Sequence, residues 1–342
     1  MLNSLMNTIG NTPLIEIDGK KWGFSCKMFA KLEYFNPMGS VKDRIAYAMI
    51  EAAEKNGTLT PGSTIVEATS GNTGAGIAMV AAQKGYKCIL VIQDKVSTEK
   101  QNLLKSLGAQ VIVVPSSIPR RAVGGVYYEA SRIAKETNGV MLDQYANPAN
   151  SAAHYKSTGP EIFSQTNGKI DYFIAGMGTC GTICGTARYL KEKLKDIQII
   201  GVEPNGSVYV GEKYAPYLVE GIGLDFIPGQ LNYNLIDEII HTTDAQAFHS
   251  ARQLASRDGI FVGGSSGAAF YGALSFAQKM PANKTIVVLF PDSGYRYLSK
   301  FYDDLWLKSK GISTDFTHDA PLLQQPVISV TVNKIQKKCE CE

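Results

Sequence analysis

Lys42 is the side chain in this sequence best placed to do chemistry, within Asn36-Pro-Met-Gly-Ser-Val-Lys-Asp-Arg44. This segment runs from a predicted loop into a predicted helix. A lysine amine can form an imine with an aldehyde cofactor, and loss of hydration near other cations keeps part of it unprotonated. A solvated lysine in a first helical turn is the alternative. The residues around Lys42 are needed to distinguish an imine-forming lysine from a solvated one.

Two loops of small residues each follow a predicted strand and open a predicted helix. They are Thr69-Ser-Gly-Asn-Thr-Gly74 and Gly178-Thr-Cys-Gly-Thr-Ile-Cys-Gly185. Glycines let the backbone approach a ligand, and the N–H groups and hydroxyls at a helix N-terminus bind anions. We therefore predict a carboxylate site at the first loop and a phosphate site at the second. Ordinary strand-to-helix turns are the alternative for both.

The second loop matches neither the G-x-x-x-x-G-K-[ST] nor the G-x-G-x-x-G motif, which argues against a nucleoside triphosphate or dinucleotide site. A third small-residue segment, Gly263-Gly-Ser-Ser-Gly267, opens another predicted helix. There Ser265 can place a neutral hydroxyl against a ring nitrogen. Taken alone, this serine is better explained as a helix cap.

Short β-branched runs alternate with amphipathic segments along the chain, which predicts parallel sheets with helical crossovers. The predicted strands are 63–67, 87–92, 110–114, 172–175, 198–202 and 285–290. The predicted helices are 41–56, 74–84, 98–107, 182–195, 244–258, 267–279 and 295–308. Thr98 and Gln101 are expected to form a capping box at the start of the third helix.

The 342 residues are enough for two domains, and an Asn/Pro/Ala/Ser-rich segment at 144–152 marks the expected crossing. We predict an N-terminal α/β domain over 1–150 and a second α/β domain over 151–310. Residues 311–342 should form a peripheral tail with one short strand, 327–332.

Lysine and arginine number 34 against 31 aspartates and glutamates, and they are scattered. No basic stripe for nucleic acid or for a membrane surface is therefore predicted. The most apolar stretch, 74–93, is broken by Gln83, Lys84 and Lys87, so it does not reach the about 20 apolar residues of a membrane span. We expect no nucleic-acid partner and no membrane segment.

Six dispersed cysteines fit reduced thiols better than a disulfide framework. The pairs Cys180/Cys184 and Cys339/Cys341 lack the further Cys and His partners of a zinc site, so no metal site is predicted. The first residues show no basic cluster followed by an apolar core, the pattern of a secretory signal. We expect a cytoplasmic protein.

Six segments, in their order and spacing, resemble the cysteine synthase and cystathionine β-synthase family. They are the Lys42 segment, the two anion loops, Asp143-Gln-Tyr-Ala-Asn-Pro-Ala-Asn150, Glu220-Gly-Ile-Gly223 and Gly263-Gly-Ser-Ser-Gly267. The resemblance implies a fold-type II enzyme with pyridoxal phosphate (PLP) in the cleft between two three-layer α/β domains. It also implies that residues 13–34 cross to the other domain, and that the protein is a homodimer.

The resemblance further implies a role for each matching residue. Lys42 would be the Schiff-base lysine, Asn72 would contact the cofactor's ring hydroxyl, and Ser265 would face the pyridine nitrogen. The residues implied for the phosphate are Gly178, Thr179, Cys180, Gly181 and Thr182. Those implied for the substrate carboxylate are Thr69, Ser70, Gly71, Thr73 and Gln144.

The implied reaction is β-replacement, in which Lys42 removes the Cα proton of serine, O-acetylserine or O-phosphoserine and a nucleophile then adds to Cβ. Cys180 stands where cysteine synthases usually have glycine, as in the branch that adds an amine in diaminopropionate and siderophore pathways. Segments 219–228 and 291–306 resemble the cystathionine β-synthase core instead.

We predict a thiol nucleophile, because thiols ionise near neutral pH and no arginine-rich motif supplies a pocket for an acidic amine. Arg120 and Arg121 are the residues that could supply one. The sequence is also compatible with a serine/threonine dehydratase and with a catalytically silent binding protein.

Overall fold

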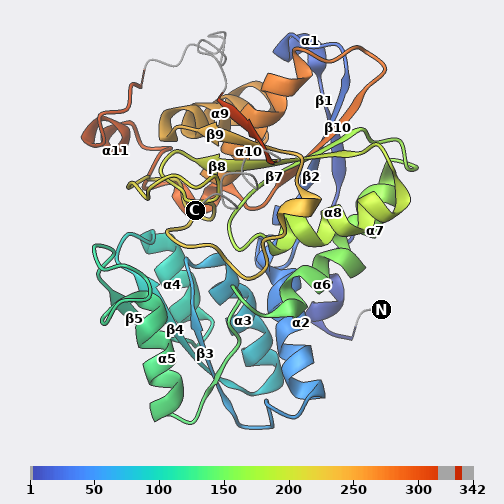
Figure 1. The fold of residues 1–342 in the computed structure, drawn as a ribbon. Coiled ribbons are helices and arrows are strands. Elements are labelled where there is room, and N and C mark those ends of the chain that lie inside the picture. Colours follow the sequence, from blue (N-terminus) through green and yellow to red (C-terminus); the bar gives the residue numbers. More distant parts are fainter. Residues whose placement is uncertain (1–2, 315–327, 333–342) are drawn as a thin grey trace.

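The computed structural model describes residues 3–314 and 328–332, whose strands form two sheets (Figure 1). The seven-stranded sheet has the order β1 (Leu14–Ile17), β2 (Lys27–Leu32), β10 (Thr285–Phe290), β7 (Tyr172–Gly176), β8 (Gln198–Pro204), β9 (Glu238–Thr242) and β11 (Ser329–Thr331). The four-stranded sheet has the order β5 (Gln110–Val114), β4 (Lys87–Gln93), β3 (Thr64–Ala68) and β6 (Val140–Met141).

Helices cover both sheets. They are α1 (Gly19–Trp22), α2 (Lys42–Lys55), α3 (Asn72–Lys84), α4 (Thr98–Ser106), α5 (Val126–Glu136), α6 (Pro148–Lys156), α7 (Thr158–Gln165), α8 (Gly181–Lys193), α9 (Asp244–Asp258), α10 (Gly264–Ala277) and α11 (Asp304–Ser309). Short 3-10 helices are η1 (Leu5–Thr8), η2 (Glu33–Phe35), η3 (Tyr233–Leu235) and η4 (Gly294–Tyr297).

The four-stranded sheet is parallel and lies between two helical layers. Successive side chains of a strand point to opposite faces, and Ile65 and Val66 of β3 accordingly enter different cores. Ile65 packs with residues of α2 and α3, and Val66 packs with residues of α5. Both faces are apolar because both are covered.

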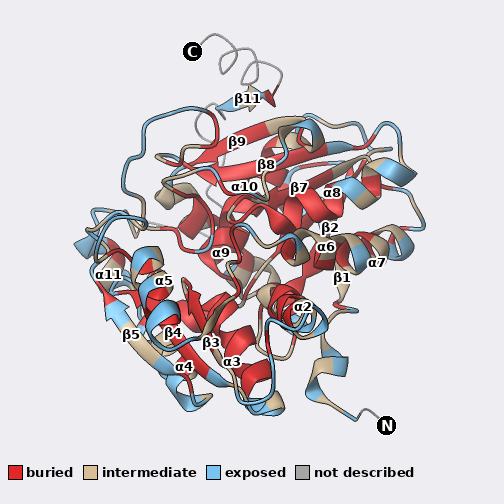
Figure 2. Ribbon diagram, turned by 60° about the horizontal axis from the view of Figure 1, so that its bottom comes forward, coloured by how far each residue is buried: buried red, intermediate tan, exposed pale blue. Residues whose placement is uncertain are grey.

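The seven-stranded sheet repeats this arrangement around β10, all of whose residues are buried (Figure 2). Ile286 and Val288 pack with α9 and α10, whereas Val287 and Leu289 pack with α8. Only the outermost strands, β1 and β11, pair antiparallel within the described residues. The expected α/β class with mostly parallel sheets is confirmed.

All predicted strands are present, and β5 and β10 have the predicted bounds. The strand predicted at 327–332 is β11, although Val327 lies outside the described residues. Strands β1 and β2 join the sheet built by residues after 150. The division of the chain near residue 150 stays a prediction.

Two local predictions are wrong. The segment 295–308 is not one helix but η4 and α11, because the side chain of Asp303 accepts from the N–H of Leu305 and starts a new helix. The capping box at Thr98 is absent because Ser97 takes the N-cap position, its Oγ accepting from the N–H of Lys100 at 3.4 Å.

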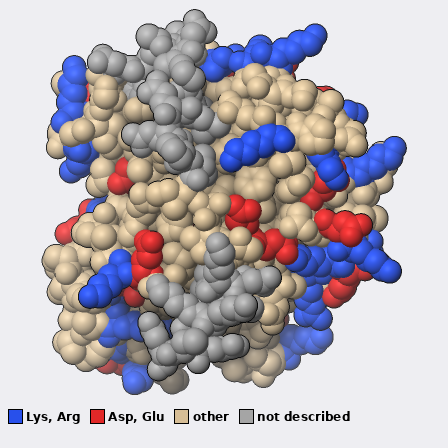
Figure 3. Space-filling model, turned by 45° about the horizontal axis from the view of Figure 1, so that its top comes forward, with Lys and Arg blue, Asp and Glu red and all other residues tan. Residues whose placement is uncertain are grey.

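Basic and acidic side chains are interspersed on the face drawn in Figure 3. None of the helices in residues 3–314 and 328–332 is both long and apolar enough to cross a membrane. Across the same residues, no three His, Cys, Asp or Glu side chains gather as metal ligands. The cysteines described there are free and buried, while Cys339 and Cys341 lie outside the described residues.

Candidate active site

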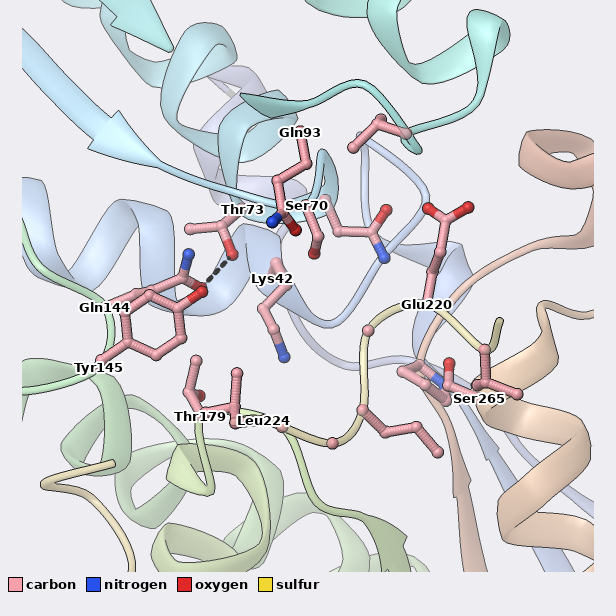
Figure 4. Close-up of a pocket in the computed structure, with 18 of the residues that line it drawn as sticks. Lys42, Ser70, Thr73, Gln93, Gln144, Tyr145, Thr179, Glu220, Leu224 and Ser265 are labelled. Atoms are coloured by element: carbon pink, nitrogen blue, oxygen red, sulfur yellow. Dashed lines mark hydrogen bonds between the residues drawn. The ribbon is translucent and has the colours of Figure 1, made fainter. Parts of the chain in front are cut away.

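One pocket between the two sheets contains most of the predicted site residues (Figure 4). Those that line it are Lys42, Ser70, Asn72, Thr73, Gln144, Gly178, Thr179 and Ser265. A smaller pocket is lined by Lys42, Gly178, Thr179, Cys180 and Thr182 among others. Thr69, Gly71 and Gly181 line neither pocket. The fold therefore brings the lysine and both predicted anion loops together.

Lys42 is the first residue of α2, and the end of β10 fixes where this helix starts. The N–H of Val41 donates to the carbonyl of Pro291 at 2.8 Å, and Ser40 forms an isolated bridge with Asp292. Loss of hydration lowers the pKa of Lys42 to about 8, and the negative charge of Asp292 partly opposes this shift. A minor but substantial fraction of the amine, about a tenth at pH 7, is thus unprotonated, and a base or nucleophile must be unprotonated to act.

The 69–74 loop takes its shape from the hydroxyl of Thr69. Its Oγ1 accepts from the N–H of Gly71 at 3.0 Å and from the N–H of Gly74 at 3.1 Å. Gly71 has a φ of +113°, a conformation that favours glycine. Thr69 thus braces the loop, and Ser70 faces the pocket.

Thr73 and Gln144, which are distant in sequence, meet in the pocket. The hydroxyl of Thr73 donates to Oε1 of Gln144 at 2.6 Å, and Nε2 of Gln144 donates to the carbonyl of Ala68 at 2.9 Å. The carboxyl of Glu67 accepts from the N–H of Gln144 at 3.1 Å. These bonds fix Thr73 and Gln144 beside Lys42 (Figure 4). One N–H of the Gln144 amide stays available to an anion.

In the predicted phosphate loop, the non-helical backbone ends at Cys180, and Gly181 is the first residue of α8. Cys180 has a φ of +64°. A non-glycine residue is uncommon in this left-handed conformation, which gives a physical reason for the glycine usual here in cysteine synthases. The first N–H groups of α8 have no intrahelical acceptor, so they are available to an anion.

Asn150, from α6, packs against this loop. Its Nδ2 donates to Oγ1 of Thr179 at 3.0 Å. A Cβ atom at Gly181 would lie 1.9 Å from Oδ1 of Asn150, so only glycine fits there. The loop is a closely packed cradle.

His154, also on α6, contacts the other threonine of the loop. Its Nε2 lies 3.1 Å from Oγ1 of Thr182, and its Nδ1 lies 2.9 Å from Oγ1 of Thr158. Burial and the charge of Lys42 hold the pKa of His154 well below its usual value, so the ring is neutral. The ring therefore orients the Thr182 hydroxyl without adding charge.

Asn72 begins α3, and its amide is held at both ends. Its Nδ2 donates to Asp292 at 2.8 Å, and its Oδ1 accepts from Nη1 of Arg296 at 2.7 Å. One N–H of the amide is left for a ligand. Ser265, near the start of α10, is buried on the pocket wall.

Glu220 lines the pocket and ties the two halves of the site together. Its carboxylate accepts from Nζ of Lys100 at 2.8 Å and from Nζ of Lys300 at 2.5 Å. Lys100 lies on α4 beside the small sheet, while Lys300 follows β10 of the large sheet. Glu220 is therefore a buried ionic link between them.

Five further pocket residues carry no motif that the sequence analysis used. They are Gln93, Lys95, Val96, Arg120 and Tyr217. Lys95 and Arg120 follow β4 and β5, at the carboxyl edge of a parallel sheet where ligands usually bind. That rule was the one available signal for Lys95. Arg120 had also been named with Arg121 as a source of a pocket for an acidic amine, and of these two only Arg120 lines the pocket.

Comparison with known proteins decides the family. A sequence model of the family described as "Pyridoxal-phosphate dependent enzyme" matches residues 5–292. The chain belongs to this family. A cystathionine beta-synthase of Apis mellifera is 46% identical over 91% of this chain, and a cysteine synthase of Staphylococcus aureus is 42% identical over 87%.

Among solved structures, the O-acetylserine dependent cystathionine beta-synthase from Helicobacter pylori has a TM-score of 0.82. It is 40% identical and covers 88% of this chain and 98% of that one. These relatives confirm the expected family and the fold-type II arrangement. This chain spans 63% of the Apis mellifera enzyme and 96% of the Staphylococcus aureus enzyme.

The site fits the cofactor of this PLP-dependent family. The tight cradle at Gly181, with the N–H groups of α8 and the hydroxyls of Thr179 and Thr182, suits a phosphate dianion. Lys42 lines the same small pocket and can reach an aldehyde carbon held there. Asn72 and Ser265 supply neutral polar groups for the ring.

The low pKa of Lys42 predicts how the PLP-free protein takes up its cofactor. Only the unprotonated amine attacks the aldehyde, so the rate should rise with pH with a midpoint near 8 and level off at higher pH. Stopped-flow absorbance across a pH series measures this rate. A midpoint near 10.5, the ordinary lysine value, would contradict the assignment of Lys42 as the nucleophile.

Thr182→Val should weaken PLP retention because the phosphate and His154 each lose the hydroxyl. Loss of one such hydrogen bond corresponds to roughly a few-fold to tenfold in affinity. Thr186→Val is the matched control, because Thr186 lies one turn later on α8 and its buried Oγ1 has no hydrogen-bond partner within the described residues. Cofactor titration of the PLP-free variants tests this, and equal affinities would refute it.

Proposed function

We propose that this protein catalyses β-replacement on serine or on an O-activated serine such as O-acetylserine or O-phosphoserine. A thiol replaces the β-substituent, and the product is L-cysteine or L-cystathionine. One observation carries the proposal: the Lys42 amine shares a pocket with two anion sites, the Thr73–Gln144 pair and the 178–182 loop. These sites suit a substrate carboxylate and a cofactor phosphate.

Bound PLP supplies an electron sink for the substrate's Cα. Nζ of Lys42 takes the proton from Cα and holds it, which its pKa of about 8 permits near neutral pH. Ser70, Thr73 and Gln144 bind the substrate carboxylate and orient the Cα–H bond toward Lys42. The buried hydroxyl of Ser265 would face the ring nitrogen of the bound cofactor and, being neutral, would not favour protonation of the ring.

Product analysis with the purified PLP-bound protein tests the reaction class. Serine, O-acetylserine and O-phosphoserine are each combined with sulfide, homocysteine or glutamate, and the products are identified by mass spectrometry. A sulfur-containing β-substituted amino acid supports the proposal. Release of ammonia and a 2-oxo acid as the main products, with or without a nucleophile, would instead indicate a dehydratase.

We also propose a cytoplasmic homodimer. The buried free cysteines described above support a reducing compartment, and family resemblance supports the dimer. Light scattering at micromolar concentration should give twice the mass of one chain. A purely monomeric species would contradict the dimer.

A further inference from the structure

A second cavity of about 290 Å³ opens beside the active-site pocket. The two spaces share four wall residues, Gln93, Lys95, Arg120 and Tyr217. The outer wall of the second cavity consists of residues 116–119, Tyr214 and Asp225. We call it the side chamber. Its volume is near the lower end of small-molecule sites, about 300–1,000 Å³.

Two cations face the side chamber against one carboxylate. Nε of Arg120 lies 3.4 Å from Oδ1 of Asp225, with the Arg120 side chain only 14% exposed. Nζ of Lys95 lies over the ring of Tyr217, 5.8 Å from its centre, and the structure records no ion pair for it among the described residues. The chamber therefore carries an excess positive charge.

The surroundings of Lys95 favour an added anion. Although Lys95 stays partly open to solvent, partial loss of hydration and the positive charge of Arg120 lower its pKa. Glu220, the other carboxylate at this end of the pocket, is already neutralised by Lys100 and Lys300. A negative group between Lys95 and Arg120 would relieve the repulsion between the two cations and form charge-assisted hydrogen bonds with them.

The donor substrate does not need this charge. Its carboxylate already has the 69–74 loop and Gln144, and Gln93 lines both the pocket and the chamber. The cations of the chamber are thus left for the molecule that attacks Cβ.

We propose that Lys95 and Arg120 bind a carboxylate of the nucleophilic substrate. The preferred nucleophile is then an amino acid that carries its own carboxylate, rather than inorganic sulfide. This inference rests on the proposed β-replacement and specifies its second substrate. A thiol amino acid and an amine amino acid share the required carboxylate, and the experiment distinguishes them.

The test measures kcat/KM of the PLP-bound protein for homocysteine, glutamate and sulfide, with the donor fixed and saturating. The variants are Arg120→Gln and Lys95→Gln. Each should lower the ratio of kcat/KM for homocysteine to that for sulfide by about tenfold or more, mainly through KM for homocysteine. Circular dichroism and cofactor content confirm that each variant is folded, and Lys95, at the exposed rim, is the safer substitution.

Arg121→Gln is the matched control. Its guanidinium stacks on Phe226 at 4.4 Å and on Tyr127 at 5.2 Å, and Arg121 lines neither the pocket nor the chamber. The ratio should not change in this variant.

Other results separate the two proposals. A ratio that is unchanged in both chamber variants, or sulfide used as efficiently as homocysteine, would overturn the carboxylate site and leave β-replacement intact. A preference for glutamate that depends on Arg120 would support the carboxylate site and overturn the proposal that the nucleophile is a thiol. No replacement with any nucleophile would overturn the proposed function itself.

Discussion

Lys42→Ala should abolish both turnover and covalent attachment of PLP. The variant loses the amine that we propose bonds to the cofactor aldehyde and takes the Cα proton. General-base catalysis alone typically contributes about 10²–10⁴-fold, so the loss of rate should reach at least this range. The visible absorbance of the cofactor bound to lysine and the rate of product formation are the two measurements.

Lys55→Ala supplies the control for this experiment. Lys55 is the last residue of the same helix α2, is exposed, and lies far from the pocket lining. It should retain both the absorbance and the rate. If Lys42→Ala retained them as well, the assignment of Lys42 would be wrong.

The second large effect concerns stability and arises from Arg44, two residues after Lys42. Its guanidinium donates to Glu33 through Nε at 2.7 Å and Nη2 at 2.9 Å, and to Glu161 through Nη1 and Nη2, each at 2.7 Å. Glu33 is buried, and the Arg44 charge holds the pKa of Glu33 below its usual value despite burial. This cluster ties α2 to α7.

Arg44→Met should therefore lower the free energy of unfolding by about 3–5 kcal/mol, because Glu33 is left buried without its cation. Urea unfolding of the PLP-bound protein measures the loss. Arg132→Met is the matched control: Arg132 pairs with Glu129 and Glu136 on the surface of α5, where ion pairs contribute about 0–1 kcal/mol. Similar losses of unfolding free energy in the two variants would show that the buried cluster stabilises the protein no more than a surface ion pair does.

The sequence predicts best where the interactions that decide a structure are local. β5 and β10 have the predicted bounds because each is a run rich in β-branched residues. This local signal holds for the fully buried β10 and for β5, a partly exposed edge strand. The loops before α3 and α8 were recognisable because small residues between a strand end and a helix start are typical of an anion site. Lys42 was singled out in the same way, from the residues next to it in the segment 36–44.

Elements that depend on distant partners were missed. β2 contains Lys31, which interrupts an apolar pattern, yet this lysine is buried. Its Nζ donates to Glu161 and Gln165, more than a hundred residues away. A pattern-based prediction cannot count a charge as buried when its partners come from another helix.

By itself, then, the sequence determined the α/β class, and it identified the lysine and the two loops that we propose bind anions, because each depends on neighbouring residues. Only the tertiary structure decided how they combine. It paired Thr73 with Gln144, placed Asn150 beneath Gly181, and lowered the pKa of Lys42 by loss of hydration. It also set Lys95 and Arg120 on a shared wall beside the pocket, since the ends of parallel strands meet only once the sheet has formed.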